Sequence, residues 1–519
     1  MEQRPVTVGP GPAPEDNGST VRRGGWLRWD FLLCLSVAML SALLSPLSDP
    51  DLPMHLRTGA WILEHGRVPL TEPFAWTRAG APFYAYSWLP EVLYELAWRG
   101  GGATMLSVLH AVLFGAAVVS VWDLARVARW SLWATRIVLF LHIQLWINAQ
   151  SATRPQLLLA LLLPVAWASA YRLGGRTDWR AKGPAIAMLA AANAVAVNSH
   201  LLFFLMLVPV VALVATPARR WQEVGAFLGA TVAGWLVSPY LSSLHGVLSL
   251  NFAPNAMQGS SSPISEMEGG FGFLRQADLM SWLFAGCLLV LPLLPFFGTR
   301  PWRERWWYGL GWLAGLGLFG IAIRGFLMWW LLALPMLAWA VADIPLPTLS
   351  FTRRAAVTAW GVAIIGLLAQ AIKSHRPFPP GIALPHPTAL ALEPAVRWLD
   401  CAVTASAATA HRAVTRFNYG SYLTWRLPGL SWSIDGRVIF PDSVALPEVG
   451  QFLSKGLPVA PPWQSADVVL LNAAHASLPT VVKDSAWQRI PLEVHDSASA
   501  VTLVVRRELA ARGAMCDAR

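Results

Sequence analysis

Residues 29–55 read WDFLLCLSVAMLSALLSPLSDPDLPMH, an apolar run that ends in two aspartates. Residues 29–47 are long and apolar enough to cross a bilayer, which takes about 20 residues. Asp49 and Asp51 follow where this segment leaves the membrane. Carboxylates are costly to desolvate there, so they suggest a proton acceptor or a ligand for a divalent cation. The alternative is that Asp49-Pro50 simply ends the helix in a hydrated loop.

The composition is that of a polytopic membrane protein. Of the 519 residues, 55% are hydrophobic and 13% are charged, and the mean hydropathy is +0.47. Soluble proteins carry roughly 25% charged residues. The 28 tryptophans agree, because indole favours the headgroup layer. The net charge of +10 does not indicate a nucleic-acid partner, because the basic residues lie in short loops without the aromatics of a base-stacking surface.

The hydropathy pattern predicts a mainly α fold with a membrane bundle of about eleven transmembrane helices. Every second connection between the apolar segments is basic, which predicts that these connections and the N-terminus are cytoplasmic. An odd number of spans then places the C-terminus outside the cytoplasmic (inner) membrane. The predicted segments are 29–47, 103–122, 131–148, 156–171, 183–198, 201–216, 223–241, 277–297, 307–323, 325–343 and 355–372.

The N-terminal part of the chain divides into a tail and a membrane domain. Residues 1–28 are polar and rich in proline and glycine, so we expect a disordered cytoplasmic tail. Residues 29–372 form the membrane domain. Its outer loops near 49–102 and 242–276 are long, and long loops in compact proteins are usually functional or disordered.

The C-terminal part has ordinary polarity. Residues 373–388 are a proline-rich linker, and residues 389–519 are enough for a small extracytoplasmic α/β domain. We expect a helix over 389–400 and buried strands over 467–471 and 500–505, which are dense in β-branched residues. Two cysteines of this region could pair in an oxidising compartment: Cys401 and Cys516.

The first outer loop is expected to hold two short helices. Residues 56–65 have the spacing of an amphipathic helix, and residues 86–98 read as a helix at the interface. A helix that begins near Leu52 would put Asp51 and His55 near one face, four residues apart.

Other polar side chains lie on the same side of the membrane as the aspartates in this topology. Arginines there suit a lipid phosphate, because guanidinium pairs bidentately with phosphate oxygens. Each residue also has a structural alternative, since arginines could reach lipid headgroups and a histidine could stabilise a turn. The candidates are Arg154, Arg324 and His200 for a donor phosphate, and Glu266 and Glu268 in the second outer loop.

Three stretches resemble the bacterial polytopic glycosyltransferases of the GT-C superfamily, in a branch with a C-terminal extracytoplasmic domain. They are residues 49–74, residues 88–94, and residues 418–423 with 433–437. The resemblance implies transfer of a sugar from a polyprenyl-phosphate carrier to an acceptor on the outer face of the membrane, with inversion at the anomeric carbon. The acceptor would be a glycan, a lipid or a protein.

The same resemblance implies roles for the acidic loop. An acidic residue of the first outer loop is usually the base of these enzymes or lies beside it, so Asp51 is the candidate base and His55 would orient it. Asp49 would be its partner, or a ligand if a divalent cation such as Mg²⁺ or Mn²⁺ is needed. Arg154 and Arg324 would steady the departing phosphate.

Glycines in the C-terminal domain indicate a structural role for its motifs. Asn418, Tyr419 and Asp435 could touch sugar, but Gly420 and Gly436 beside them predict tight turns. We therefore expect this domain to bind an acceptor or a partner and to perform no chemistry itself.

Two alternatives to the enzyme stay open. A flippase or transporter of lipid-linked glycans would usually show an internal repeat, and none is evident. A catalytically inactive scaffold is the other, because residues 52–54 and 198–201 differ from related sequences. Sequence motifs of other enzyme classes, such as a Walker loop, a Gly-x-Ser-x-Gly elbow or a His-Glu-x-x-His zinc helix, do not occur.

Overall fold

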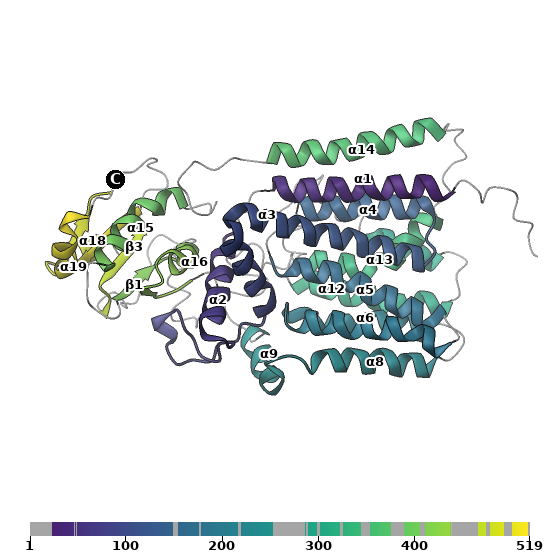
Figure 1. Ribbon diagram of the computed structural model, residues 1–519, viewed down its shortest axis with the longest axis horizontal. Coiled ribbons are helices and arrows are strands. Elements are labelled where there is room, and N and C mark those ends of the chain that lie inside the picture. The colour runs from purple at the N-terminus through teal and green to yellow at the C-terminus, as the bar shows by residue number, and fades with distance from the viewer. Residues whose placement is uncertain are drawn as a thin grey trace, which may run out of the picture.

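The computed structural model describes most of the chain from residue 23 to residue 516. A helical bundle lies at one end and a small sheet domain at the other, with α2 and the first part of α3 between them (Figure 1). The described residues are 23–45, 47, 49–148, 154–175, 178–215, 220–252, 286, 289–297, 302–321, 325–343, 353–374, 389–404, 411–435, 437, 465–473, 478–492 and 501–516.

The bundle helices coincide with the predicted apolar segments, apart from 277–297, which lies largely outside the described residues. By length and composition, α3 and α5 qualify as membrane-crossing helices, and the number of eleven spans stays a prediction. The bundle contains α1 (Arg23–Leu44), α3 (Trp88–Val127), α4 (Leu132–Asn148), α5 (Gln156–Gly175), α6 (Trp179–Val197), η4 (Leu201–Val210), α7 (Val211–Val214), α8 (Trp221–Trp235), η7 (Leu291–Phe297), α12 (Trp302–Ile321), α13 (Gly325–Asp343) and α14 (Arg353–Ser374).

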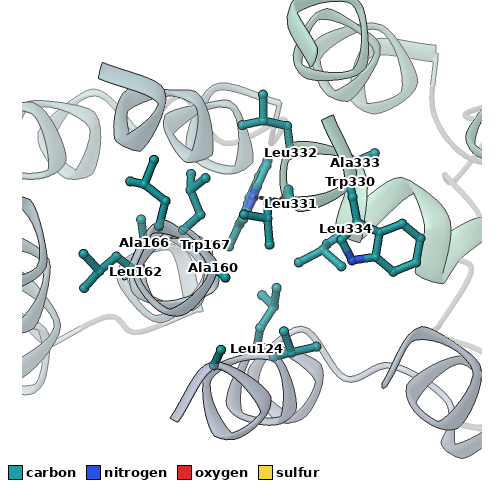
Figure 2. Packing of buried hydrophobic residues seen from close by; sticks show 14 of the residues in the cluster. Leu124, Ala160, Leu162, Ala166, Trp167, Trp330, Leu331, Leu332, Ala333 and Leu334 are labelled. Atoms are coloured by element: carbon teal, nitrogen blue, oxygen red, sulfur yellow. Dashed lines mark hydrogen bonds between the residues drawn. The ribbon is translucent and has the colours of Figure 1, made fainter. Parts of the chain in front are cut away.

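Large apolar side chains fill the centre of the bundle. Trp167 of α5 and Trp330 of α13 are fully buried, and the indole of Trp167 donates to the carbonyl of Leu331 at 3.3 Å (Figure 2). The outward faces of several helices are apolar as well, which is expected where lipid surrounds the protein. Exposed examples are Leu32, Val112, Val232 and Ile365.

The long helix α3 contains a break that separates an outer arm from a bundle helix. Gly101 and Gly102 have non-helical backbone angles, and Gly102 has φ +58°, a conformation that favours glycine. The arm before the break corresponds to the predicted interfacial helix 86–98. It lies beside α2 (Leu52–His65), which contains the predicted helix 56–65 and begins four residues earlier, at Leu52.

The layer between the helical bundle and the C-terminal domain also holds short helical turns. The C-terminal domain packs directly on this layer. Leu52, Leu56 and Tyr94 share one apolar core with Tyr422 and Leu423 of the domain, so the two parts are continuous. The short elements of the outer layer are η2 (Trp76–Arg78), η5 (Leu241–Ser243) and α9 (Leu244–Phe252).

The described residues of the C-terminal domain form a five-stranded mixed sheet with helices, which agrees with the expected combination of helices and strands. The strand order is β2-β1-β3-β5-β4, with β1 parallel to β2 and β3, and β5 antiparallel to β3 and β4. Cys401 and Cys516 form a disulfide. The elements are α15 (Ala389–Thr404), β1 (His411–Thr415), α16 (Phe417–Arg426), β2 (Leu430–Trp432), β3 (Val468–Asn472), α18 (Leu478–Lys483), β4 (Trp487–Ile490), β5 (Val501–Arg506), α19 (Arg507–Arg512) and η10 (Gly513–Met515).

The predicted turn at Gly420 is wrong. Gly420 lies inside α16, and a Cβ atom there would stand 2.0 Å from the carbonyl oxygen of Ile434. This glycine is therefore needed for a close approach of helix and backbone. Gly436 lies outside the described residues.

Candidate functional site

Asp49 and Asp51 lie between the end of α1 and the start of α2, and they differ in environment. The Asp49 side chain is 2% exposed; its Oδ2 accepts from Arg154 Nε at 2.6 Å and its Oδ1 from the amide of Asp51 at 2.9 Å. The Asp51 side chain is 40% exposed, with its Oδ2 3.6 Å from a terminal nitrogen of Arg154. Asp49 is therefore a buried anchor, and Asp51 is the accessible carboxylate.

Arg154 links the aspartates to the bundle. It lies two residues before the start of α5, and its carbonyl accepts from the amide of Leu157 in the first turn of that helix. Its guanidinium contacts both Asp49 and Asp51. In the structure this arginine orders the acidic turn.

His55 lies one helical turn after Asp51 and faces a buried acid of another helix. Its Nδ1 is 3.0 Å from Oε1 of Glu91, in the first turn of α3. Burial lowers the pKa of His55. The hydrogen bond to Glu91 and the charges of Glu91, Asp51 and Asp49 outweigh that effect, so the pKa is raised above its usual value. The site thus holds a histidine whose charged form is favoured.

Glu91 was not identified as a site residue from the sequence, although it lies in the motif of residues 88–94. The signal that could have found it is an acid in the first turn of a largely apolar helix. Its side chain is 8% exposed. Glu91 Oε2 and the Tyr94 hydroxyl have no hydrogen-bond partner among the described residues. Burial, with the charges of Asp49 and Glu91, raises the pKa of Tyr94 above its usual range, so this phenol stays neutral.

A close approach of α2 and α3 brings these groups together. A Cβ atom on Gly59 would stand 2.1 Å from the carbonyl oxygen of Glu91 and 2.9 Å from Cβ of Glu95. Only glycine allows this spacing, so Gly59 sets the distance between the helix of His55 and the helix of Glu91.

Of the remaining predicted site residues, the structure describes His200. Nδ1 of His200 accepts from the amide of Leu202 and caps η4, the structural role considered for it. Its turn touches the start of α3, because Asn198 accepts from the indole of Trp88 at 2.9 Å. Three further candidates lie outside the described residues: Arg324, Glu266 and Glu268.

The described residues do not fit a metal ion at Asp49. Both oxygens of this carboxylate accept hydrogen bonds, from Arg154 and from the amide of Asp51. Among the residues that the structure describes, no group of three or more His, Cys, Asp or Glu side chains could hold a metal.

The C-terminal domain is joined to the first outer loop by a buried ion network. Glu72, whose side chain is fully buried, accepts through Oε1 from Arg437 at 2.8 Å and from the amide of Phe74 at 2.9 Å. Arg437 also binds Asp435, with 2.7 Å between Nε and Oδ1. The network joins the first and third motifs of the sequence, and Asp435, considered as a sugar contact, is engaged in it. Asn418 is exposed and Tyr419 is buried on α16.

Comparison with solved structures identifies the fold. No protein-family model matches the chain, and no curated protein matches it. ArnT from Cupriavidus metallidurans bound to undecaprenyl phosphate superposes with a TM-score of 0.54 at 14% identity, over 92% of this chain and 98% of that one. The apo oligosaccharyltransferase of Archaeoglobus fulgidus gives 0.54 at 12% identity, over 88% and 70%.

A second archaeal structure agrees. AglB from Archaeoglobus fulgidus, in complex with an inhibitory peptide and a dolichol-phosphate, gives a TM-score of 0.52 at 12% identity, over 86% of this chain and 70% of that one. The chain therefore has the GT-C fold, and the resemblance stated from the sequence is confirmed at the level of the fold.

Proposed function

We propose that the protein is a membrane glycosyltransferase that moves a sugar from a polyprenyl-phosphate carrier to an acceptor at the outer face of the cytoplasmic membrane. The observation that carries this proposal is the accessible carboxylate of Asp51, held beside the buried Asp49–Arg154 pair at the outer end of a GT-C bundle. Solved structures with this fold support it, because ArnT was solved with bound undecaprenyl phosphate and AglB with a bound dolichol-phosphate.

Asp51 is the proposed base. Arg154 holds the buried Asp49 at 2.6 Å and is 3.6 Å from Asp51, whose side chain is 40% exposed, so Asp51 is the carboxylate that a substrate can reach. It takes the proton of an acceptor hydroxyl while the oxygen attacks the anomeric carbon. The bond from that carbon to the phosphate oxygen breaks, and the phosphate keeps the electron pair. The configuration inverts, because the nucleophile enters opposite to the leaving group.

The neighbouring groups have supporting roles in the proposal. Arg154 holds the acidic turn in place and, with Arg324, steadies the departing phosphate. His55 orients Asp51 from one helical turn away. His200, whose turn touches the start of α3, is the remaining candidate for the phosphate, and Glu266 and Glu268 are candidates for the acceptor side. The acceptor is a glycan, a lipid or a protein.

The orientation in the membrane is part of the proposal. Structural disulfides persist in oxidising compartments, so the Cys401–Cys516 bond supports an extracytoplasmic C-terminal domain. The basic loops between apolar segments support a cytoplasmic N-terminus.

A transfer assay on full-length protein in detergent tests the function. Radiolabelled sugars on undecaprenyl phosphate are supplied with an envelope extract as the source of acceptors. We expect label to leave the lipid with wild type, and Asp51→Asn to lower the rate about 10²–10⁴-fold, the usual contribution of a positioned base. Asp400→Asn, on the exposed face of α15, is the matched control and should transfer normally.

The outcomes separate the alternatives. Near-normal turnover by Asp51→Asn would remove Asp51 from the role of base. Movement of the intact lipid-linked sugar across liposomes, without transfer, would indicate a transporter. Absence of both activities with every donor tested would indicate a scaffold.

A further inference from the structure

Glu91 is a buried acid without a permanently charged partner among the residues that the structure describes. Its side chain is 8% exposed, and its carboxylate lies 3.0 Å from an imidazole nitrogen, Nδ1 of His55. A buried carboxylate is costly unless it is paired and hydrogen-bonded. Because ionised Glu91 is only an acceptor, Nδ1 of His55 carries the proton that is shared between them.

The geometry fixes this pair rigidly. Gly59 keeps α2 against α3, with no room for a Cβ atom beside the carbonyl of Glu91. The ring of His55 lies edge-on to Tyr94, with 6.3 Å between the ring centroids. The His55 side chain is 19% exposed, and since Nδ1 is held by Glu91, Nε2 is the nitrogen left to meet a substrate.

Charge balance favours a charged His55. Three carboxylates lie close to one another at this site, and Arg154 is engaged mainly by Asp49. With a neutral His55, Arg154 would be the only cation among these five groups. The charges of Glu91, Asp51 and Asp49 all favour the imidazolium.

We propose that Glu91 is a positioning residue, which holds His55 through Nδ1 as a charged hydrogen-bond donor whose Nε2 faces an oxygen of the substrate beside Asp51. That oxygen belongs either to the phosphate of the lipid carrier or to the acceptor. The proposal rests on the proposed glycosyl transfer, but the pairing of Glu91 with His55 can be measured without it. The groups that face His55 are Glu91 and Tyr94 of α3, with Asp51 and Asp49 at the start of α2.

Histidine NMR tests the pairing. Full-length protein with ¹³C-labelled histidine is titrated in detergent, and the signal of His55 is assigned by its loss in His55→Gln. We expect His55 to stay protonated to a higher pH in wild type than in Glu91→Gln. Glu95→Gln is the matched control, because Glu95 is the same residue type on the same helix and pairs with Arg99 at 2.7 Å. It should leave the His55 titration unchanged.

The pH profile of transfer tests the role. Since the charged form of His55 is the active one, transfer should decline at alkaline pH. That decline should move to lower pH in Glu91→Gln and vanish in His55→Gln, whose residual activity is low. A purely structural role of Glu91 would lower transfer equally at every pH. A binding measurement with undecaprenyl phosphate alone distinguishes the carrier phosphate from the acceptor as the partner of His55. The affinity for this lipid should fall in Glu91→Gln only if His55 contacts the carrier phosphate.

Two results would overturn the inference. One is an unchanged His55 titration in Glu91→Gln, and the other is a pH profile that keeps its shape when Glu91 is replaced. Absence of transfer by wild type with every donor would instead contradict the proposed function, and the NMR titration would still decide whether Glu91 controls His55.

Discussion

Arg154 Nε lies 2.6 Å from Oδ2 of Asp49, and this contact joins the start of α5 to the end of the first bundle helix, 105 positions earlier. Both side chains are largely buried. The acidic turn therefore has a fixed shape before any substrate binds, which is the condition for a positioned base.

Loss of one partner of the Asp49–Arg154 pair should be costly. Asp49→Asn leaves the Arg154 guanidinium without its main counter-charge, and breaking a buried pair costs about 3–5 kcal/mol. We expect a clear drop of the apparent melting temperature in detergent, together with loss of transfer. Asp123→Asn is the control, because the Asp123–Arg172 pair is more exposed and such pairs contribute about 0–1 kcal/mol. Equal effects of the two variants would contradict a special role for Asp49.

Replacement of Arg437 should loosen the C-terminal domain from the outer loop. The charges of Asp435 and Glu72 outweigh the effect of burial and raise the pKa of Arg437, so it is charged at every physiological pH. Arg437→Met leaves Asp435 and Glu72 buried without this cation, which costs about 3–5 kcal/mol.

Limited proteolysis measures that change. We expect faster cleavage between the domain and the membrane bundle in Arg437→Met. Glu508→Gln, on the exposed face of α19, should cleave at the wild-type rate. If both variants resist protease as wild type does, the ion network does not hold the domain.

The sequence alone predicts the helices and strands that have a strong local hydrophobic pattern. The apolar runs predict the bundle helices, and the amphipathic spacing of residues 56–65 predicts most of α2. β3 and β5 are dense in valine and leucine, so their prediction is confirmed. The strands β1, β2 and β4 were not predicted, and the three-residue β2 lacks such a pattern.

The site contacts could not be predicted in the same way. His55 and Glu91 lie on different helices, and Glu72 and Arg437 are 365 positions apart, so only tertiary packing brings them together. The error at Gly420 has a similar cause. A glycine in a polar segment suggests a turn, but Gly420 lies in a helix and allows that helix to approach the backbone of Ile434, which lies outside it.

The stability of the protein should depend on pH through His55. Its pKa is raised in the folded state, so the contribution of the Glu91–His55 pair is fully present below the unfolded value of about 6.5 and is lost as the pH rises through the folded value. The difference in melting temperature between wild type and His55→Gln should therefore be largest at acidic pH and shrink at alkaline pH. A difference that grows with pH would contradict this sign.

Gly59→Ala should separate α2 from α3. The new methyl group would meet the backbone of Glu91 at 2.1 Å, and backbone cannot rotate away. We expect a destabilisation of about 1–3 kcal/mol, as for other overpacked sites, with reduced transfer because His55 and Glu91 move apart. Gly229→Ala in α8 is the control, because among the described residues no atom beyond the helix's own backbone lies within 4 Å of a Cβ there. The control should be neutral or slightly stabilising, since alanine favours helix over glycine.

The disulfide between Cys401 and Cys516 should stabilise the C-terminal domain and report its side of the membrane. It joins α15 to the end of the chain across a separation of 115 residues, and closing such a loop is worth about 4–5 kcal/mol in the chain-entropy model. Cys401→Ser should therefore lower the melting temperature of the domain, whereas Cys34→Ser, at a buried free cysteine of α1, leaves the bond intact.

The same disulfide tests the orientation of the domain. In intact spheroplasts, a membrane-impermeant reductant followed by a bulky maleimide should add label to wild type and less to Cys401→Ser. If label is added only after the membrane is opened, the domain lies on the cytoplasmic side and the proposed orientation is wrong.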